Sequence, residues 1–277
     1  MVRTYLYKSI FFLLLILSEA LTDDRFSVKP SSCGIGQILT ISCGPDVRNA
    51  FFLGKEYTLF DDGTGRSVMI GIGLKTLPGK YELMAGSNSK TVEIFEPDYP
   101  SEKLSVNSDL ASKTRTLSDE SGMIVGVLGL ATAERLYWQE FIWPLVIKTV
   151  SSPFGSKRVY NDGLLAWQHK GTDLVNKPGS PVIASNSGKV AFSKKLKIHG
   201  NTIIIDHGRG IFTLYNHLDK RLVRKGQIMK RGQLIGTLGD TGMVTGPHLH
   251  FGLSVYGERV DPSELLGRPQ VPSSQKQ

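Results

Sequence analysis

The sequence predicts a mostly β protein with two domains, on the basis of three observations. The chain has 277 residues, which is enough for two domains of about 100–200 residues each. It contains 30 glycines and 13 prolines, which indicate many turns. Short runs rich in β-branched and aromatic residues recur between these turns, whereas signals for helices are rare. With 40% hydrophobic and 21% charged residues, the composition excludes wholesale disorder.

Residues 1–20 have the layout of a secretory signal peptide. Arg3 and Lys8 give a positive start, residues 10–17 are a short apolar run, and the small residues Ser18 and Ala20 close the segment. The apolar run is much shorter than the roughly 20 residues of a membrane-spanning helix. We therefore expect cleavage, export to the periplasm, the cell wall or the extracellular space, and no stable membrane span in the mature chain.

The formal net charge of the chain is +8. Outside a cell, a basic protein meets anionic wall polymers, lipid head groups and stray nucleic acid, and charge alone does not choose among them. The lysines and arginines are scattered along the sequence, which favours a solubilising surface. We expect no nucleic-acid partner, and the oligomeric state stays open.

Residues 24–98 read as an immunoglobulin-like β-sandwich. Six short β-rich runs, from "GQILTISC" to "KTVEIFE", are separated by turn residues such as Asp62-Gly63 and Pro78-Gly79. No residue of this stretch suggests catalysis. The domain is therefore expected to position the chain, contact the wall or cover the groove of the second domain.

Cys33 and Cys43 lie ten residues apart within this domain. Export permits a disulfide, which would close a loop short enough to stabilise the fold by roughly 2–3 kcal/mol. The alternative is two buried thiols on neighbouring strands. We favour the disulfide, and without a nearby histidine the pair makes a poor zinc site.

Residues 99–145 are predicted to form a short, partly helical connector. Ser118, with Asp119 and Glu120, can cap the first turn of a helix. Glycines at 122, 126 and 129 weaken this helix. The segment therefore separates two β domains rather than forming a domain itself.

Residues 146–266 are predicted to form the second β domain. The runs "GNTIIIDHG", "GIFTLYNHL", "GQLIGTLGD" and "LHFGLSV" are strands bounded by glycine, and "VRKGQIMKRGQ" is typical of a turn-rich hairpin. Residues 267–277 are expected to be a disordered tail.

All histidines of the chain lie in this second domain, and two short motifs pair them with possible partners. In "GPHLHFG", His248 and His250 share one face of a strand while Leu249 points to the core. In "HKGTD", an extended chain places His169 and Asp173 on one face, and Gly171 between them leaves room for a metal.

A catalytic zinc site takes three protein ligands and keeps one position for water. His169, Asp173 and one histidine of the "HLH" pair would supply the three. The remaining histidines can act as acid–base groups because imidazole titrates near neutral pH. The pattern indicates metal-assisted hydrolysis.

Five blocks, in order, resemble the signature of the M23 family of zinc metallopeptidases, the lysostaphin and LytM-like enzymes that cut peptidoglycan cross-bridges. They are "SSPFGSKR", "HKGTDL", "GNTIIIDHGRGIFTLYNHL", "VRKGQIMKRGQLIGTLGDTGMVTGPHLHFGL" and "RVDP". The resemblance covers about residues 150 to 265 and implies a LytM-like antiparallel β-sheet peptidase domain. Residues 50–100 also resemble the β domain that precedes the catalytic unit in many exported members.

The resemblance implies roles for particular residues. His169, Asp173 and His250 would bind one Zn²⁺ per chain, and His217 and His248 would be the catalytic pair. We favour His248 as general base and His217 as the group that stabilises charge on the carbonyl oxygen, although the order of the two stays open. His199 and His207 have no place in the motifs. We expect His199 to lie in a loop and His207 to end a strand with a hydrogen bond.

The resemblance thus implies an exported zinc metalloendopeptidase that hydrolyses the peptide cross-links of peptidoglycan in wall remodelling or lysis. One alternative is a LytM-fold regulatory or binding module that activates other wall hydrolases. A second is a peptidase acting on glycine-rich proteins, and a third is a carrier domain modified on Lys230. All five site residues are present, which gives no support to a loss of activity.

Overall fold

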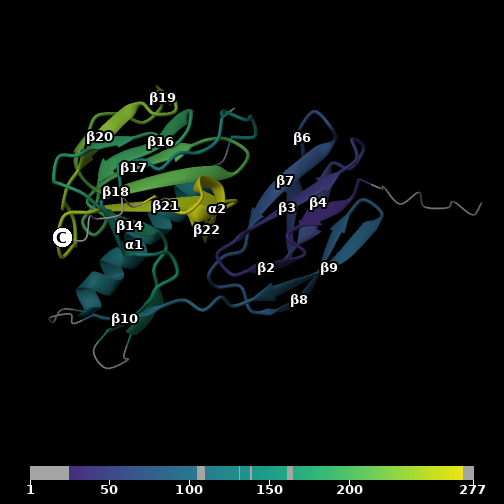
Figure 1. The fold of residues 1–277 in the computed structure, drawn as a ribbon, viewed down its shortest axis with the longest axis horizontal. Coiled ribbons are helices and arrows are strands. Elements are labelled where there is room, and N and C mark those ends of the chain that lie inside the picture. The colour runs from purple at the N-terminus through teal and green to yellow at the C-terminus, as the bar shows by residue number, and fades with distance from the viewer. Residues whose placement is uncertain (1–24, 105–109, 131, 138, 161–164, 271–277) are drawn as a thin grey trace, which may run out of the picture.

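The computed structural model describes residues 25–104, 110–130, 132–137, 139–160 and 165–270. The predicted signal peptide and residues 271–277 of the expected tail lie outside this range. The described chain is mostly β, as predicted, with two helices (Figure 1). Within the described ranges, no helix combines the length and the apolar character needed to cross a bilayer.

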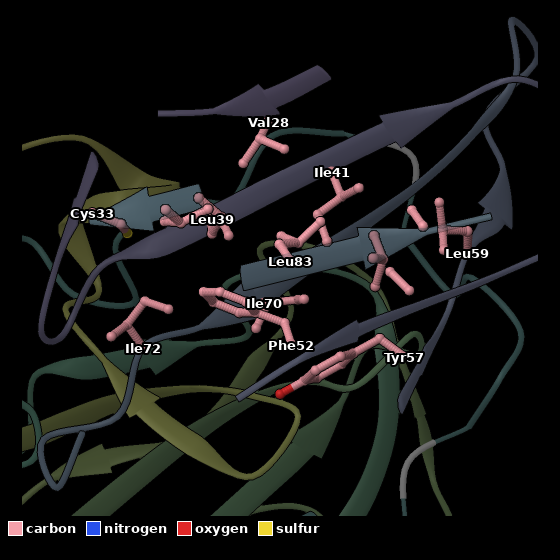
Figure 2. Packing of buried hydrophobic residues seen from close by; sticks show 14 of the residues in the cluster. Val28, Cys33, Leu39, Ile41, Phe52, Tyr57, Leu59, Ile70, Ile72 and Leu83 are labelled. Carbon is pink, nitrogen blue, oxygen red and sulfur yellow. The ribbon is translucent and has the colours of Figure 1, made fainter. Parts of the chain in front are cut away.

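The N-terminal part is a sandwich of two sheets with an apolar interior (Figure 2). The four-stranded sheet has the order β1 (Ser27–Lys29), β3 (Ile38–Cys43), β7 (Arg66–Gly71), β6 (Phe60–Asp61). The five-stranded sheet has the order β2 (Ser32–Gly34), β9 (Asn88–Phe95), β8 (Gly79–Ala85), β4 (Asn49–Phe52), β5 (Lys55–Thr58). Inward residues such as Leu39, Phe52 and Leu83 are fully or almost fully buried because the two sheets face each other.

The expected disulfide between Cys33 and Cys43 is wrong. Both side chains are buried, and they form no disulfide. The Gly34 amide donates to Gln37 Oε1, which places Cys33 near the beginning of β3 (Figure 2). Cys43 is the last residue of this six-residue strand, which spans about 17 Å. The two residues therefore lie near opposite ends of the strand, too far apart to be bonded.

The predicted connector contains strand β10 (Ser101–Leu104) and helix α1 (Leu110–Leu128). The expected start of the helix near Ser118 is wrong, because the helix begins eight residues earlier. Ile124 and Leu128 are buried against the large sheet described below, and this packing outweighs the low helix propensity of the glycines inside α1. Glu120 does not cap the helix but accepts hydrogen bonds from the backbone of residues 197–199.

A ten-stranded antiparallel sheet forms most of the C-terminal part. Its main path is β11 (Thr149–Ser152), β14 (Thr172–Val175), β21 (Leu249–Val255), β18 (Ile211–Arg221), β17 (Asn201–Asp206), β16 (Gly188–Lys195), β19 (Ile228–Met229). Three further strands pair off this path: β15 (Pro181–Ile183), β20 (Leu234–Leu238) and β22 (Glu258–Val260). A separate three-stranded sheet contains β10, β12 (Lys157–Tyr160) and β13 (Leu165–Gln168), and the chain continues from β22 into α2 (Ser263–Leu266).

The segment expected to be a hairpin, residues 223–233, does not fold back on itself. Its strand β19 pairs with the start of β16 instead, with Met229 opposite Gly188. Met229 is buried in the apolar core beneath the large sheet, so burial of this side chain favours pairing with β16.

The two faces of the large sheet have different neighbours. On β21, Leu249 and Phe251 point into the main apolar core, whereas the alternating residue His250 points to the other face. Leu214 pairs with Gly252 and lies on the same face as His250. On this face Leu214 belongs to the apolar cluster that packs against α1. The helix and His250 therefore share one side of the sheet.

The sandwich contacts the large sheet around β22 and α2 (Figure 1). The Asp261 amide donates to Gly36 O at 2.7 Å, and the Ile38 amide donates to Glu264 Oε2 at 3.1 Å. The rings of Tyr57 and Tyr256 meet edge to face. Backbone and aromatic contacts thus join the two parts directly.

Candidate active site

The structure brings together all five predicted site residues, namely His169, Asp173, His217, His248 and His250. Strand pairing explains the convergence. β14 pairs with β21 so that Asp173 lies opposite His250, and β18 pairs with β21 so that Asn216 lies opposite His250. Three segments that are distant in sequence therefore meet at one end of neighbouring strands.

His169, Asp173 and His250 form a compact cluster of potential metal ligands. One ligand atom from each lies within 4.8 Å of the others. Asp173 Oδ1 is 3.0 Å from His169 Nε2 and 2.9 Å from His250 Nδ1. Among the described residues, these are the ones whose carboxylate and imidazole atoms come together in this way.

The donor set fits zinc, which favours imidazole nitrogen and carboxylate oxygen. His169 Nδ1 donates to Pro153 O at 3.0 Å, which leaves Nε2 free to act as a ligand. Arg158 Nη2 donates to Asp173 Oδ2, which leaves Oδ1 facing the two histidines. Partners of this kind fix the tautomer and orientation of metal ligands.

Gly171 permits the close approach of the two ligand segments. A Cβ atom at this position would lie 2.6 Å from Phe251 O and 2.7 Å from His250 Nε2. Any side chain would therefore displace the imidazole of His250. The glycine thus leaves room for the imidazole of His250, one of the predicted ligands, and the expectation that it also leaves room for a metal stays a prediction.

His217 and His248 lie beside this cluster. Their ring centroids are 5.0 Å apart, and His248 Nε2 is 3.8 Å from Asp173 Oδ1. His217 Nδ1 faces Thr241 O at 2.9 Å, and His248 Nδ1 faces Gly246 O at 2.8 Å. A carbonyl only accepts, so both Nδ1 atoms carry the proton and both Nε2 atoms are acceptors in the neutral ring.

The backbone of His217 has an unusual conformation. Its φ is +62°, in the left-handed region that β-strand residues rarely occupy. The pairing of β18 with both β17 and β20 is irregular next to this residue. The His217 amide donates to His199 O at 3.0 Å, which fixes the bend. Such conformations cost of order 1–3 kcal/mol and are concentrated at functional sites.

The protonation states suit metal binding and proton transfer. Burial raises the pKa of Asp173, but hydrogen bonds from His169 and His250 and the charges of these rings hold it well below its ordinary value. Burial lowers the pKa of His250 well below its ordinary value. Burial and the neighbouring His248 lower the pKa of His217 to about 4. At neutral pH the carboxylate is therefore ionised and both imidazoles are neutral, the forms that bind metals or accept protons.

The other two histidines lie outside the cluster of ligands. His207 follows β17, and its ring bonds to Ser187 O and Thr213 Oγ1, each at 2.8 Å, as expected for a hydrogen-bonded strand end. His199 lies in the loop before β17, as expected, and its Nδ1 is 2.7 Å from Glu120 Oε2.

Several polar neighbours of the site were not predicted. Arg158 and Glu102 come from β12 and β10, and both contact Ser152. Asn216 is buried opposite His250, and its Oδ1 has no hydrogen-bond partner in the described part of the chain. Nothing in the spacing of these residues indicates their proximity, because each contact depends on how separate strands pair.

Comparison with known proteins places the site within a family. Residues 167–262 match the model of "Peptidase family M23". The peptidoglycan DD-endopeptidase ShyC of Vibrio cholerae is 42% identical over 130 residues, which are 47% of this chain and 30% of that protein. The DD-carboxypeptidase/endopeptidase Mpg of Neisseria meningitidis is 37% identical over 137 residues, 49% of this chain and 31% of that protein. The chain thus matches about three tenths of the length of these curated relatives.

A solved structure extends the likeness to the sandwich. A crystal structure from Pseudomonas aeruginosa, provisionally described as a peptidase M23, superposes with a TM-score of 0.67 at 25% identity. The match covers 84% of this chain and 94% of that one. The chain therefore carries a domain of peptidase family M23, and this domain contains all five predicted site residues.

Proposed function

We propose that this chain is an exported zinc metalloendopeptidase that hydrolyses the peptide cross-links of peptidoglycan. The observation that carries the proposal is the convergence of His169, Asp173 and His250 beside a second pair of imidazoles. Relatives that share the domain are named as peptidoglycan endopeptidases, which supports this substrate.

In the proposed site, His169 Nε2, Asp173 Oδ1 and His250 Nδ1 would hold one Zn²⁺. When bound, zinc supplies a Lewis acid that polarises a carbonyl and makes water easier to deprotonate. The protein contributes an ionised carboxylate, two oriented rings and a buried setting in which charges interact strongly.

The second pair of histidines moves the protons. We assign His248 as general base because its Nε2 acceptor lies 3.8 Å from the ligand oxygen Asp173 Oδ1. The same residue can then deliver the proton to the leaving amine. Neutral His217 has no proton on Nε2, so it would first take up a proton from the solvent, and negative charge developing beside it would raise its pKa and favour this uptake. His217 would thus donate a hydrogen bond chiefly in the transition state, where such an interaction accelerates the reaction.

Digestion of purified peptidoglycan sacculi by the zinc-loaded mature protein tests the proposal. Mass spectrometry of the fragments is expected to show cleaved peptide cross-links and intact glycan strands. Fragments that contain only shortened glycan strands would contradict a peptidase. Absence of cleavage, with stimulation of a separate wall hydrolase, would favour a regulatory module, and cleavage of a glycine-rich protein alone would favour the other peptidase reading.

His250→Ala tests the proposed set of zinc ligands. This variant is expected to lose both zinc and hydrolysis while the sandwich of residues 25–98 stays folded, because its core is separate. Zinc content is measured by elemental analysis and folding by circular dichroism. Full zinc occupancy in this variant would show that the ligand set is wrong.

A further inference from the structure

Arg158 reaches the candidate metal site from a strand outside the large sheet. It lies on β12, opposite Trp167 of β13. Its Nη2 donates to Asp173 Oδ2 at 2.9 Å, and the two side chains are only 17% and 8% exposed. This ion pair is therefore shielded from water, unlike the exposed pairs elsewhere on the surface.

The same guanidinium links Asp173 to a second candidate ligand. Arg158 Nη2 also donates to Ser152 Oγ at 3.0 Å, and Ser152 Oγ lies 3.3 Å from His169 Nδ1. A continuous set of polar contacts thus runs from one ligand to the other through Arg158 and Ser152.

The contact decides which oxygen of Asp173 faces the histidines. With Oδ2 held by Arg158, Oδ1 points to His169 Nε2 and His250 Nδ1. A guanidinium remains charged at every accessible pH and has a rigid, planar set of donors, so it fixes orientation better than an ammonium group. Without Arg158, the carboxylate of Asp173 could rotate. Oδ2 could then take the place of Oδ1 as the ligand atom, or both oxygens could face the metal.

We propose that Arg158 is a positioning residue that holds Asp173 with Oδ1 directed at the metal. The inference rests on the proposed function only in that the three predicted ligands bind zinc. Arg158 does not touch the metal or the substrate in this proposal. It acts through Asp173 and, by way of Ser152, supports His169.

Zinc affinity of the full mature protein, measured by competition with a chromophoric chelator, tests the proposal. Arg158→Gln is expected to weaken zinc binding about 10–100-fold, the usual effect of removing a partner of a metal ligand. Arg158→Lys is expected to lie between this variant and the wild type, because one ammonium cannot reproduce both contacts. The visible spectrum of the Co²⁺-loaded Arg158→Gln protein is expected to differ from that of the wild type, since the ligand oxygen is no longer fixed.

Lys157→Gln is the matched control. It removes the same charge from the adjacent residue, whose partner is the exposed Glu96 at 2.7 Å. Its zinc affinity and Co²⁺ spectrum are expected to equal those of the wild type. Equal loss in Lys157→Gln and Arg158→Gln would overturn the proposal, because net charge alone would explain it.

Glu102→Gln separates positioning from the docking of β10. Glu102 Oε2 is 3.7 Å from Arg158 Nε, and Oε1 accepts from Ser152 Oγ at 3.0 Å. If Arg158 served only to attach β10, this variant would lose zinc affinity as Arg158→Gln does, which would overturn the proposal. We expect wild-type affinity.

Two further outcomes distinguish failure of this inference from failure of the proposed function. Wild-type zinc affinity in Arg158→Gln would overturn this inference while leaving the proposed function in place. Failure of the wild type itself to bind zinc would overturn both. If Arg158→Gln does not fold, as judged by circular dichroism, Arg158→Lys against Lys157→Gln makes the same comparison.

Discussion

The two β parts of the molecule differ in what they bury. In the described residues 25–104, the buried side chains are all hydrophobic. The C-terminal part buries an apolar core of similar kind, but it also buries histidines, Asp173, Asp206 and several hydroxyl and amide groups. Both parts are sheets with alternating inward residues, so secondary structure alone does not explain the difference.

Burying a polar group costs about 1–3 kcal/mol unless it finds a hydrogen-bond partner. The sandwich avoids this cost, and its apolar interior is sufficient to define a fold. In the C-terminal part the polar groups are partnered in a specific pattern, as at His217 Nδ1 with Thr241 O and at Asp173 with Arg158. The comparison shows that the buried polar groups, and with them the candidate site, belong to the C-terminal part.

The largest effect is expected from the proposed catalytic pair. His217→Ala and His248→Ala should each retain zinc and lose about 10²–10⁴-fold in the rate of cross-link cleavage, since acid–base catalysis contributes this much. Rates are measured on purified sacculi, with zinc content as the control. A wild-type rate in either variant would remove that residue from the mechanism.

A core substitution in the sandwich should affect stability alone. Phe52 is 1% exposed, so Phe52→Ala is expected to cost roughly 3–5 kcal/mol in the unfolding free energy of the sandwich. Urea denaturation measures this cost. The neighbouring Phe51→Ala, at 48% exposure, should change stability by at most about 0.5 kcal/mol. Loss of zinc from folded Phe52→Ala protein would contradict the division of roles.

His207 should make the C-terminal part sensitive to acid. Burial lowers its pKa to about 4, below the ordinary value of about 6.5, so protons bind more readily to the unfolded chain. Stability is therefore expected to fall as the pH drops from about 6.5 to about 4, by up to about 3 kcal/mol. Urea unfolding of wild type and His207→Gln at several pH values measures this part. An identical pH dependence in the two proteins would assign the effect to other groups.

The smallest effect is expected at the contact between the two parts. Lys55 Nζ lies 2.7 Å from Glu258 Oε1, but these side chains are 53% and 35% exposed. Solvent screening limits such a pair to about 0–1 kcal/mol, so Lys55→Met should leave thermal stability and hydrolysis nearly unchanged. A large change in either quantity would show that the sandwich controls the site through this surface.

The candidate site was predictable because its residues lie in short motifs. His169 and Asp173 are four apart, and His248 and His250 are two apart, so local geometry and family resemblance identify them together. Arg158 was not predictable, because its contact with Asp173 depends on β12 folding back against the end of β14. The left-handed conformation of His217 depends in the same way on irregular pairing of β18.

The fold was predictable at the level of strands and less so at their connections. The run "LHFGLSV" was predicted as a strand bounded by glycine, and β21 has these bounds. The start of α1 was not predicted, because docking of Ile124 and Leu128 stabilises a glycine-containing helix whose intrinsic propensity is low. The disulfide prediction failed because sequence separation says little about distance in space: Cys33 lies in β2 of one sheet, whereas Cys43 ends β3 of the other.

The position of α1 has a consequence for which part of the chain can fold alone. Its buried residues cover Phe192, Ile204, Phe212 and Leu214, which would otherwise form an apolar surface on the face that carries His250. Strand β10 likewise completes a sheet with β12 and β13. A fragment that began at residue 146 would expose this surface to water and favour self-association. We therefore expect the smallest autonomous module to begin near β10, ahead of the predicted boundary at residue 146, because α1 and β10 complete the C-terminal part.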